Sequence, residues 1–259
     1  MNSAIELNNI YFSYEHQSIF KNFTLSIYEN NITYIMGNNG CGKTTLLNII
    51  NGLLIPKTGV ISVFGINIRK LNSKELAKRV AYVPQTIRQN IDFCVKDYLA
   101  LGRLPYLKFG FDPSNDDYAI VEQYASKMGV LEYLNLNFNQ LSGGQKQLVT
   151  ITRALIQETP IIILDEPMSA LDIGKQADFL CTIQKLKNDL GKTLILTSHN
   201  PNHALQSDCN VCLIYERKIL QYGKNTEVLN KENIQKVYGS KVKFELNTRN
   251  VVFNISGRI

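Results

Sequence analysis

The stretch that decides the fold is ITYIMGNNGCGKT, residues 32–44. Its first five residues form a short apolar run, which is typical of a buried strand, and Gly37 ends that run. The next eight residues match the pattern GxxxxGK followed by Ser or Thr, and they precede a predicted helix over residues 45–51. A loop of this kind predicts a phosphate-binding site, because its glycines let backbone N–H groups turn inward and the helix start adds positive potential.

Side chains of this loop have expected roles of their own. We expect Lys43 to supply a positive charge for the outer phosphates and Thr44 to place its hydroxyl on Mg²⁺. Cys41 lies inside the predicted cradle, so a bulky adduct on its thiol should exclude a nucleotide. The residues predicted to hold the nucleotide here are Gly37, Asn38, Asn39, Gly40, Cys41, Gly42, Lys43, Thr44 and Thr45.

Around this loop, apolar runs rich in Ile, Val and Tyr alternate with segments of helical period. That alternation predicts an α/β fold with a mainly parallel sheet flanked by helices. The other expected strands are residues 5–14, 80–83, 161–164, 193–197 and 211–215, and a short helix is expected at 73–78. Residues 95–156 are mostly helical in pattern, with a helix-start signal at 112–115, so we expect an inserted helical subdomain over about 86–156.

A second motif is IIILDE, residues 161–166, in which a continuous apolar run ends in two carboxylates. Such a run is typical of a parallel strand buried on both faces, and open α/β sheets bind ligands at the carboxyl ends of their strands. We expect Asp165 to hold Mg²⁺ through water and Glu166 to act as the general base that activates the attacking water.

A third motif is LSGGQ, residues 141–145, which comes directly before a helical stretch. Ser142 is a favourable N-cap residue, and the two glycines after it expose backbone donors. The motif therefore predicts a second helix start that can bind an anion.

LSGGQ between a phosphate loop and an LDEP strand resembles the signature of ATP-binding cassette proteins, the ABC family. The resemblance implies a P-loop NTPase core with an antiparallel N-terminal β region, one domain over residues 1–240 and a short extension over 241–259. It implies ATP and Mg²⁺ as cofactors and a homodimer in which the signature of one copy closes on the ATP of the other. Ser142, Gly143, Gly144 and Gln145 would then bind nucleotide.

Four further positions carry roles through this resemblance. Gln85 resembles the glutamine that touches Mg²⁺ and reports the nucleotide state, and Asp172 lies in a segment, SALD, that resembles the loop crossing the dimer interface. His199 resembles the switch histidine at the γ-phosphate, and Tyr14 resembles the aromatic residue that stacks on adenine, although a plain strand aromatic is the alternative. Asn200, where Asp is frequent, leaves the hydrogen bonding of His199 open.

The resemblance also indicates a transport role. Residues 95–111 resemble the region that receives a membrane subunit, and the aromatics there are either an interface patch or internal core: Tyr98, Tyr106, Phe109 and Phe111. LDIGKQ, residues 171–176, looks like the subfamily that imports iron chelates such as siderophores and haem, cobalamin and, in some members, molybdate. We therefore expect the motor subunit of an importer, with permease subunits and, indirectly, a substrate-binding protein as partners.

Alternatives are an exporter motor, an ABC protein that acts on ribosomes or DNA, and a regulatory module without catalysis. The second is disfavoured because the chain has one cassette and no sustained heptads, and the third because the catalytic set is complete. A net charge of +6 comes from scattered basic residues, so we expect no nucleic-acid partner. We find no signal peptide and no long apolar run, which predicts a chain at the cytoplasmic face of the inner membrane, attached through permease subunits.

The chain has five cysteines, and two of them spell CxxC: Cys209 and Cys212. An odd number without a signal peptide predicts reduced thiols rather than a disulfide framework. Because the pair lies on or beside a predicted strand, the two side chains should point to opposite faces, where they cannot easily chelate one metal.

Overall fold

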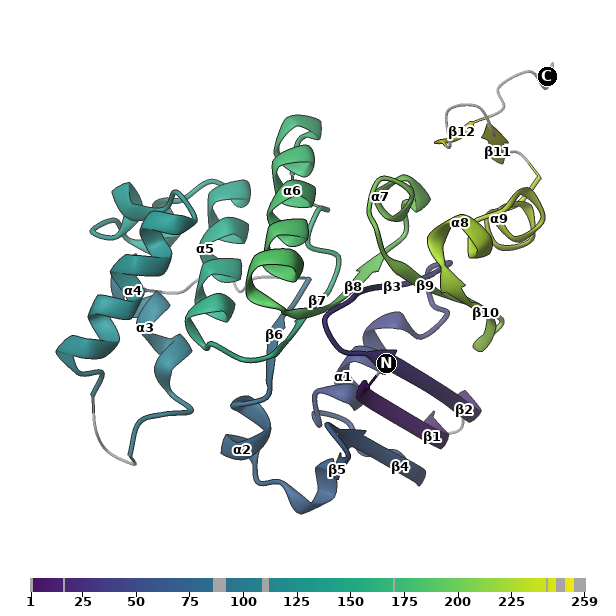
Figure 1. Cartoon of the computed structure of the whole chain (residues 1–259), viewed down its shortest axis with the longest axis horizontal. Helices are drawn as coiled ribbons and strands as arrows, with labels where there is room; N and C mark the ends of the chain where they lie inside the picture. Colours follow the sequence, from purple (N-terminus) through teal and green to yellow (C-terminus); the bar gives the residue numbers. More distant parts are fainter. Residues whose placement is uncertain are drawn as a thin grey trace.

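The computed structural model describes residues 2–15, 17–85, 92–108, 112–169, 171–240, 242–245 and 250–253. A mainly parallel sheet crosses the middle of Figure 1, an antiparallel sheet lies at the lower right, and a lobe of helices lies at the left. This arrangement confirms the predicted α/β class with an antiparallel N-terminal region and an inserted helical lobe.

The central sheet has six strands in the order β10-β9-β3-β8-β7-β6. Its strands are β3 (Ile32–Gly37), β6 (Val80–Val83), β7 (Ile161–Leu164), β8 (Thr193–Ser198), β9 (Asn210–Tyr215) and β10 (Lys218–Lys224). All neighbours are parallel except the hairpin of β9 and β10. All residues of β3, β7 and β8 are buried, which is why they appear in the sequence as continuous apolar runs.

The second sheet is antiparallel, with the order β2-β1-β4-β5. It consists of β1 (Ser3–Tyr14), β2 (Gln17–Tyr28), β4 (Thr58–Val63) and β5 (Ile66–Asn67). Of these four strands, only β1 was predicted from the sequence. The pairing of β1 with β2 has register shifts, and Asn9 and Asn22 have positive φ values of 51° and 53°. These irregularities interrupt the alternation of apolar and polar residues that marks a strand in sequence.

Helices cover both faces of the central sheet. Tyr34 packs in a cluster with Phe179 of α6 (Ile173–Leu190), and Ile35 packs on the other face in a cluster with Leu46 of α1 (Lys43–Ile50). The remaining elements outside the helical lobe are η1 (Ile68–Lys70), α2 (Ser73–Ala77), α7 (Pro201–Leu205), α8 (Asn225–Val228), α9 (Lys231–Tyr238), β11 (Val242–Glu245) and β12 (Asn250–Phe253). The phosphate loop therefore leaves the sheet from a strand that is covered on both faces.

The helical lobe lies between β6 and β7 in the chain. It contains α3 (Val95–Ala100), η2 (Leu101–Arg103), α4 (Asn115–Lys127), η3 (Leu131–Tyr133), η4 (Phe138–Gln140) and α5 (Gly143–Ile156). Tyr98 is 3% exposed and its ring centroid lies 4.3 Å from that of Phe138, so Tyr98 is internal core and not an interface residue. Tyr106 is partly exposed, and the two expected phenylalanines, Phe109 and Phe111, lie outside the described residues.

The cysteine pair behaves as the strand pattern predicts. Cys209 packs in the cluster on the α6 side of the sheet, whereas Cys212 packs in the cluster on the α1 side. Burial raises the pKa of the Cys209 thiol to about 12 and raises that of Cys212 as well. Both side chains are therefore buried core groups on opposite faces of one sheet.

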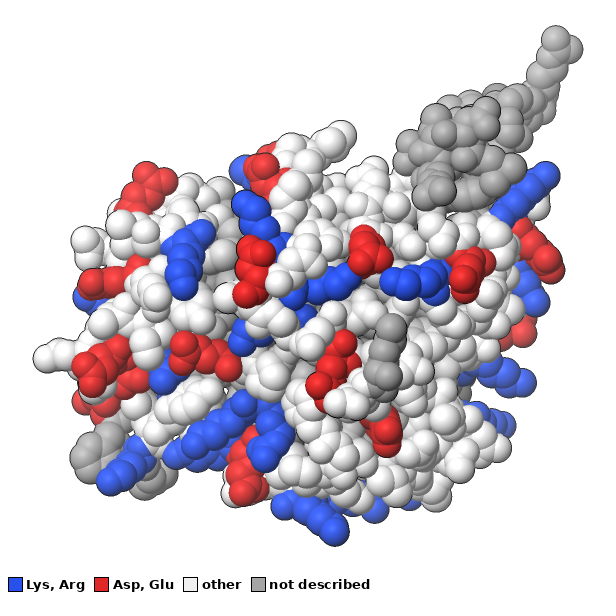
Figure 2. Space-filling view, viewed as in Figure 1, with Lys and Arg blue, Asp and Glu red and all other residues white. Residues whose placement is uncertain are grey.

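Figure 2 shows Lys and Arg side chains interspersed with Asp and Glu over the face that it draws. Within the described ranges, no helix is long and apolar enough to cross a bilayer.

Candidate nucleotide site

The phosphate loop joins β3 to α1, and its glycines have backbone conformations that favour glycine. Gly40 has φ 77° and Gly42 has φ 106°. Because Gly42 is the N-cap residue, α1 begins at Lys43, two residues earlier than predicted. The Lys43 ammonium donates hydrogen bonds to the carbonyl oxygens of Gly37 at 2.9 Å and Asn38 at 3.2 Å. The positive charge is thus held over the loop.

Gly37 is required by the close approach of a neighbouring strand. A Cβ atom at this position would lie 2.3 Å from the carbonyl oxygen of Ile214 on β9 and 2.8 Å from Cys41 Sγ. Since the nearer of these atoms belongs to the backbone of a central strand, no side-chain movement could relieve the clash. Gly37 therefore lets the loop leave the sheet without displacing β9.

The Cys41 side chain lies beneath the loop and not in the cradle. It is 7% exposed and packs in the same apolar cluster as Phe20 and Leu46. Burial raises the pKa of its thiol, although the charge of Lys43 acts in the opposite direction. The expectation that the thiol lines the nucleotide space is therefore corrected. Cys41 contributes its backbone to the loop, and its side chain belongs to the apolar core.

We expect Cys41 to resist alkylation in the folded protein, because a buried thiol with a raised pKa forms little reactive thiolate. Cys181 on α6 is exposed and provides an internal control. Brief treatment with N-ethylmaleimide, followed by peptide mass spectrometry, should label Cys181 and leave Cys41 unlabelled, with ATPase activity unchanged. Both should react in guanidinium chloride. Equal labelling of the two thiols in the folded protein would contradict this placement.

Thr44 and Thr45 occupy the first turn of α1, and Thr44 is exposed. Thr45 Oγ1 lies 3.4 Å from the hydroxyl oxygen of Tyr14, which comes from the end of β1. The Tyr14 ring is 44% exposed and packs edge-on against Phe12. The fold thus places Tyr14 beside the start of α1, although the two positions are thirty-one residues apart in sequence.

Asp165 is the first residue after β7, and its carboxylate is buried at 1% exposure. Its Oδ1 accepts a hydrogen bond of 2.5 Å from the Thr197 hydroxyl, whereas its Oδ2 is buried and has no hydrogen-bond partner among the described residues. Burial, and then the negative charge of Asp165, raise the pKa of nearby Tyr82 to about 12. A buried carboxylate oxygen of this kind fits a site that receives a cation or an ordered water.

The next residue, Glu166, contacts the two other side chains that were predicted to be catalytic. Glu166 Oε2 lies 3.0 Å from His199 Nδ1 and 3.4 Å from Gln85 Nε2, which donates to it. Glu166 has φ 45°, an uncommon conformation for a residue with a long side chain. The three residues follow β7, β8 and β6, so the parallel sheet brings them together at its carboxyl edge.

Thr197, which was not predicted from the sequence, orients both acidic residues. Its hydroxyl donates to Asp165 and accepts the backbone N–H of Glu166 at 2.7 Å. The only signal in the sequence was its position as the last residue of the expected strand before His199.

Asn200 follows His199 at a position where Asp is frequent, and its presence left the hydrogen bonding of His199 open. In the structure the Asn200 side chain caps α7 by accepting the backbone N–H of Asn202, so it does not compete for His199 Nδ1.

The signature begins α5 as predicted, with Ser142 as its N-cap. Ser142 Oγ accepts the backbone N–H of Gln145, and Gln145 Oε1 accepts the backbone N–H of Ser142 at 2.8 Å, which completes a capping box. Gly143 is exposed in the first turn. In Figure 1 α5 belongs to the helical lobe, whereas α1 lies under β3. The signature and the phosphate loop of the same chain therefore lie in different parts of the structure.

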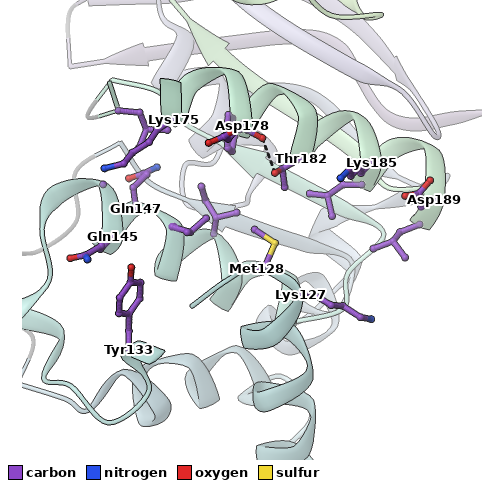
Figure 3. A pocket seen from close by; sticks show the side chains of 17 residues that line it. Lys127, Met128, Tyr133, Gln145, Gln147, Lys175, Asp178, Thr182, Lys185 and Asp189 are labelled. Carbon is purple, nitrogen blue, oxygen red and sulfur yellow. Dashed lines mark hydrogen bonds between the residues drawn. The ribbon is translucent and has the colours of Figure 1, made fainter. Parts of the chain in front are cut away.

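A groove of about 680 Å³ lies behind the signature, between α6 and the ends of α4 and α5. Figure 3 shows Gln145 and Tyr133 on one side of this groove and Lys175 and Asp178 on the other. The groove thus separates the start of α5 from α6, whereas Leu155 farther along α5 packs in the same apolar cluster as Phe179 of α6.

Asp172 is exposed and caps α6, since its Oδ1 accepts the backbone N–H of Lys175 at 2.9 Å. That backbone hydrogen bond, followed by the hydrogen bond and charge of the Lys175 ammonium, lowers the pKa of Asp172. Asp172 thus remains at the surface, apart from the meeting point of Glu166, His199 and Gln85.

Comparison with known proteins assigns the family. The sequence profile of the ABC transporter family matches residues 20–169, more than half of the chain. The chain therefore belongs to the ABC transporter family, and it is an ATPase.

Relatives match along most of the chain. An uncharacterised ABC transporter ATP-binding protein of Haemophilus influenzae is 33% identical over 90% of this chain and 89% of its own length. The ferric enterobactin transport ATP-binding protein FepC of Escherichia coli is 32% identical over 87% of this chain and 83% of FepC. Among solved structures, an ABC transporter of the metal-chelate type in an inward-facing conformation has a TM-score of 0.81 at 28% identity, covering 92% of this chain and 89% of that one.

Proposed function

We propose that the chain is the ATP-hydrolysing motor subunit of a bacterial ABC importer, with an iron chelate such as a siderophore or haem as cargo, or a related cargo such as cobalamin or molybdate. The observation that carries the enzymatic part is the meeting of Glu166, His199 and Gln85 at the carboxyl edge of the parallel sheet. The names of the relatives, which include ferric enterobactin transport and a metal-chelate transporter, support the cargo class.

In this proposal Glu166 is the general base for the water that attacks the γ-phosphate. Its carboxylate is 12% exposed and lies against the imidazole of His199, which is 59% exposed and free to reach a phosphate oxygen. Lys43 turns its ammonium from the loop carbonyls to the outer phosphates when ATP enters. Tyr14, beside the start of α1, stacks on the adenine ring.

Mg²⁺ fits the donors that surround the phosphate loop. Asp165 offers a buried oxygen that no group in the described part of the chain hydrogen-bonds, and Thr44 and Gln85, both exposed, offer a hydroxyl and an amide oxygen. Oxygen donors of this kind are the ligands that Mg²⁺ prefers. When bound, the ion neutralises charge on the phosphates, while Thr197 keeps the Asp165 carboxylate in orientation through its hydroxyl.

The signature supports a site that is shared between two copies of the chain. Ser142, Gly143 and Asp172 are exposed, and the signature lies on the helical lobe, away from the phosphate loop of the same chain. In a twofold dimer, the start of α5 in one copy would close the nucleotide held by the loop of the other, with Gly143, Gly144 and Gln145 supplying polar groups.

Permease subunits would hold this motor peripherally at the cytoplasmic face of the inner membrane, with a substrate-binding protein as an indirect partner. We assign residues 1–240 to one ATP-binding domain, with the helical subdomain over about 86–156 and an extension over 241–259. An exporter would share the ATP chemistry, but the import roles and metal chelates named among the relatives favour import.

Uptake of radioiron chelates by cells that lack the gene tests this proposal. We expect uptake to fail, to return with the native chain, and to stay absent with Lys43→Ala, because that variant loses the cation that binds the phosphates. Lys231→Ala, which changes an exposed lysine on α9, is the matched control and should restore uptake. Normal uptake without the gene would contradict an iron cargo and direct the same assay to cobalamin and molybdate.

A further inference from the structure

Behind the catalytic residues lie two polar side chains that have no role in the function proposed above, Gln176 on α6 and His203 on α7. Both line the cavity of about 160 Å³ that also contains Glu166 and His199. The Gln176 amide nitrogen donates to the carbonyl oxygen of Met168 at 3.2 Å and to that of Leu171 at 3.1 Å. One side chain thus holds two carbonyl groups of the turn that follows Glu166.

The same side chain continues to His203. Because the Gln176 amide nitrogen is used by the two carbonyl groups, its oxygen is the atom that faces His203 Nε2, at 3.3 Å. His203 Nε2 also lies 3.4 Å from the Asn200 amide nitrogen, and His203 Nδ1 lies 3.0 Å from the Ser198 hydroxyl oxygen, so both ring nitrogens have polar partners. Burial, and then the nearby His199, lower the pKa of His203 to about 4 despite the opposing charge of Glu166, so the imidazole is neutral at pH 7.

These hydrogen bonds join the two segments that carry the catalytic groups. Ser198 directly precedes His199, and His199 lies against the Glu166 carboxylate. On the other side, the Glu166 carbonyl oxygen accepts the hydroxyl of Ser169 at 2.9 Å and its backbone N–H at 3.2 Å. Two connections therefore join the turn after Glu166 to the end of β8. One is the contact of His199 with Glu166, and the other runs through Gln176 and His203.

We propose that Gln176 and His203 are positioning residues for ATP hydrolysis, which fix the turn after Glu166 against the end of β8 and so hold Glu166 and His199 in register. This inference rests on the function proposed above and deepens it. Glu166 has φ 45°, and a non-glycine residue keeps such a conformation only where its surroundings impose it. The hydrogen bonds from Gln176 to Met168 and Leu171 constrain the chain within five residues of that position.

The position of Leu171 adds a link to the dimer. Leu171 precedes Asp172, the exposed cap of α6 in the segment that the proposal places at the partner. A shift of this segment on dimer closure would pull on the amide of Gln176 and, through His203, on Ser198. Gln176 and His203 thus connect the segment of Asp172, which the proposal places at the partner, with His199, which the proposal places at the γ-phosphate.

A double-mutant cycle on ATPase kinetics tests the proposal. Gln176→Ala and His203→Ala should each lower kcat roughly ten- to hundredfold, as expected for a slight misplacement of reacting groups, and should change KM for ATP by less than about twofold. The double variant should be no slower than the slower single variant, because both changes break one chain of hydrogen bonds. Gln184→Ala, on the same helix and with an amide nitrogen that has no hydrogen-bond partner in the described chain, is the matched control and should retain native kcat.

Two conservative variants replace the alanines if those do not fold, as judged by thermal unfolding. Gln176→Glu removes the amide donor and sets carboxylate oxygens against two carbonyl oxygens, so kcat should fall. His203→Gln retains a donor and an acceptor, so kcat should stay within about threefold of native. Multiplicative losses in the double variant, native kcat in the single variants, or equal losses in both conservative variants would overturn the positioning role.

The outcomes separate this inference from the function on which it rests. If the native chain hydrolyses ATP and Glu166→Gln abolishes hydrolysis, while the Gln176 and His203 variants keep native kcat, only the positioning role fails. If Glu166→Gln hydrolyses ATP normally, the assignment of the base fails first, and the positioning role fails with it.

Discussion

Glu166→Gln should retain ATP binding and lose turnover by roughly 10²- to 10⁴-fold, the usual contribution of a general base. The amide keeps the size of the side chain and its place beside His199 and Gln85, but it cannot accept a proton from water. The measurement is kcat from phosphate release, together with the affinity for a fluorescent ATP analogue such as mant-ATP. Affinity should stay near the native value, because the phosphate loop and Lys43 are unchanged.

Glu232→Gln is the matched control for this variant, because Glu232 is an exposed glutamate in the first turn of α9. It should hydrolyse ATP at the native rate. Normal turnover by Glu166→Gln would show that another group activates the water, whereas loss of mant-ATP binding would show that the substitution acts on the nucleotide pocket and not on the chemical step.

Arg103→Leu should lower the free energy of unfolding by about 3–5 kcal/mol, because it leaves a buried carboxylate without its partner. Arg103 and Asp117 are each 8% exposed, and Arg103 Nε donates to Asp117 Oδ1 at 2.9 Å. Its Nη1 also reaches Glu158 Oε2 at 2.8 Å and the carbonyl oxygen of Ile156 at 3.1 Å. Urea unfolding followed by circular dichroism measures the loss.

The loss should depend on pH in a defined direction. Burial raises the pKa of Asp117, but hydrogen bonds from Ser114 and Arg103 lower it to a value below the ordinary one. The native ion pair therefore contributes its stability above the unfolded-state pKa of about 3.9 and loses it as pH falls. The difference between native protein and Arg103→Leu should be largest at neutral pH and shrink in acid.

Lys96→Met is the matched control, because Lys96 forms an ion pair with Glu122 in the same lobe, and the side chains are 34% and 56% exposed. An exposed pair of this kind contributes about 0–1 kcal/mol, so this variant should remain close to native stability. Equal losses in the two variants would show that burial of the Arg103 pair has no special weight in the helical lobe.

Local residue patterns were sufficient for the parts of the fold that local chemistry controls. β3 and β7 appear as continuous apolar runs because both of their faces are buried, and Ser142 and Ser114 act as helix caps through contacts three residues away. The same patterns did not find β2 and β4, because the pairing of β1 with each of them has register shifts, which interrupt the alternation of apolar and polar residues that marks a strand.

The sequence by itself determined the phosphate loop, the acidic end of β7 and the signature, because each motif lies within a few neighbouring residues whose spacing carries the chemistry. Only the tertiary structure decided which way a side chain of a motif points and which distant groups meet it. Cys41 lies under the loop because the apolar cluster of α1 takes its thiol, and Thr197 reaches Asp165 because β7 and β8 are neighbours. Gln176 and His203 meet behind Glu166 for the same reason, since their contact depends on how α6 and α7 pack, which no short stretch of sequence records.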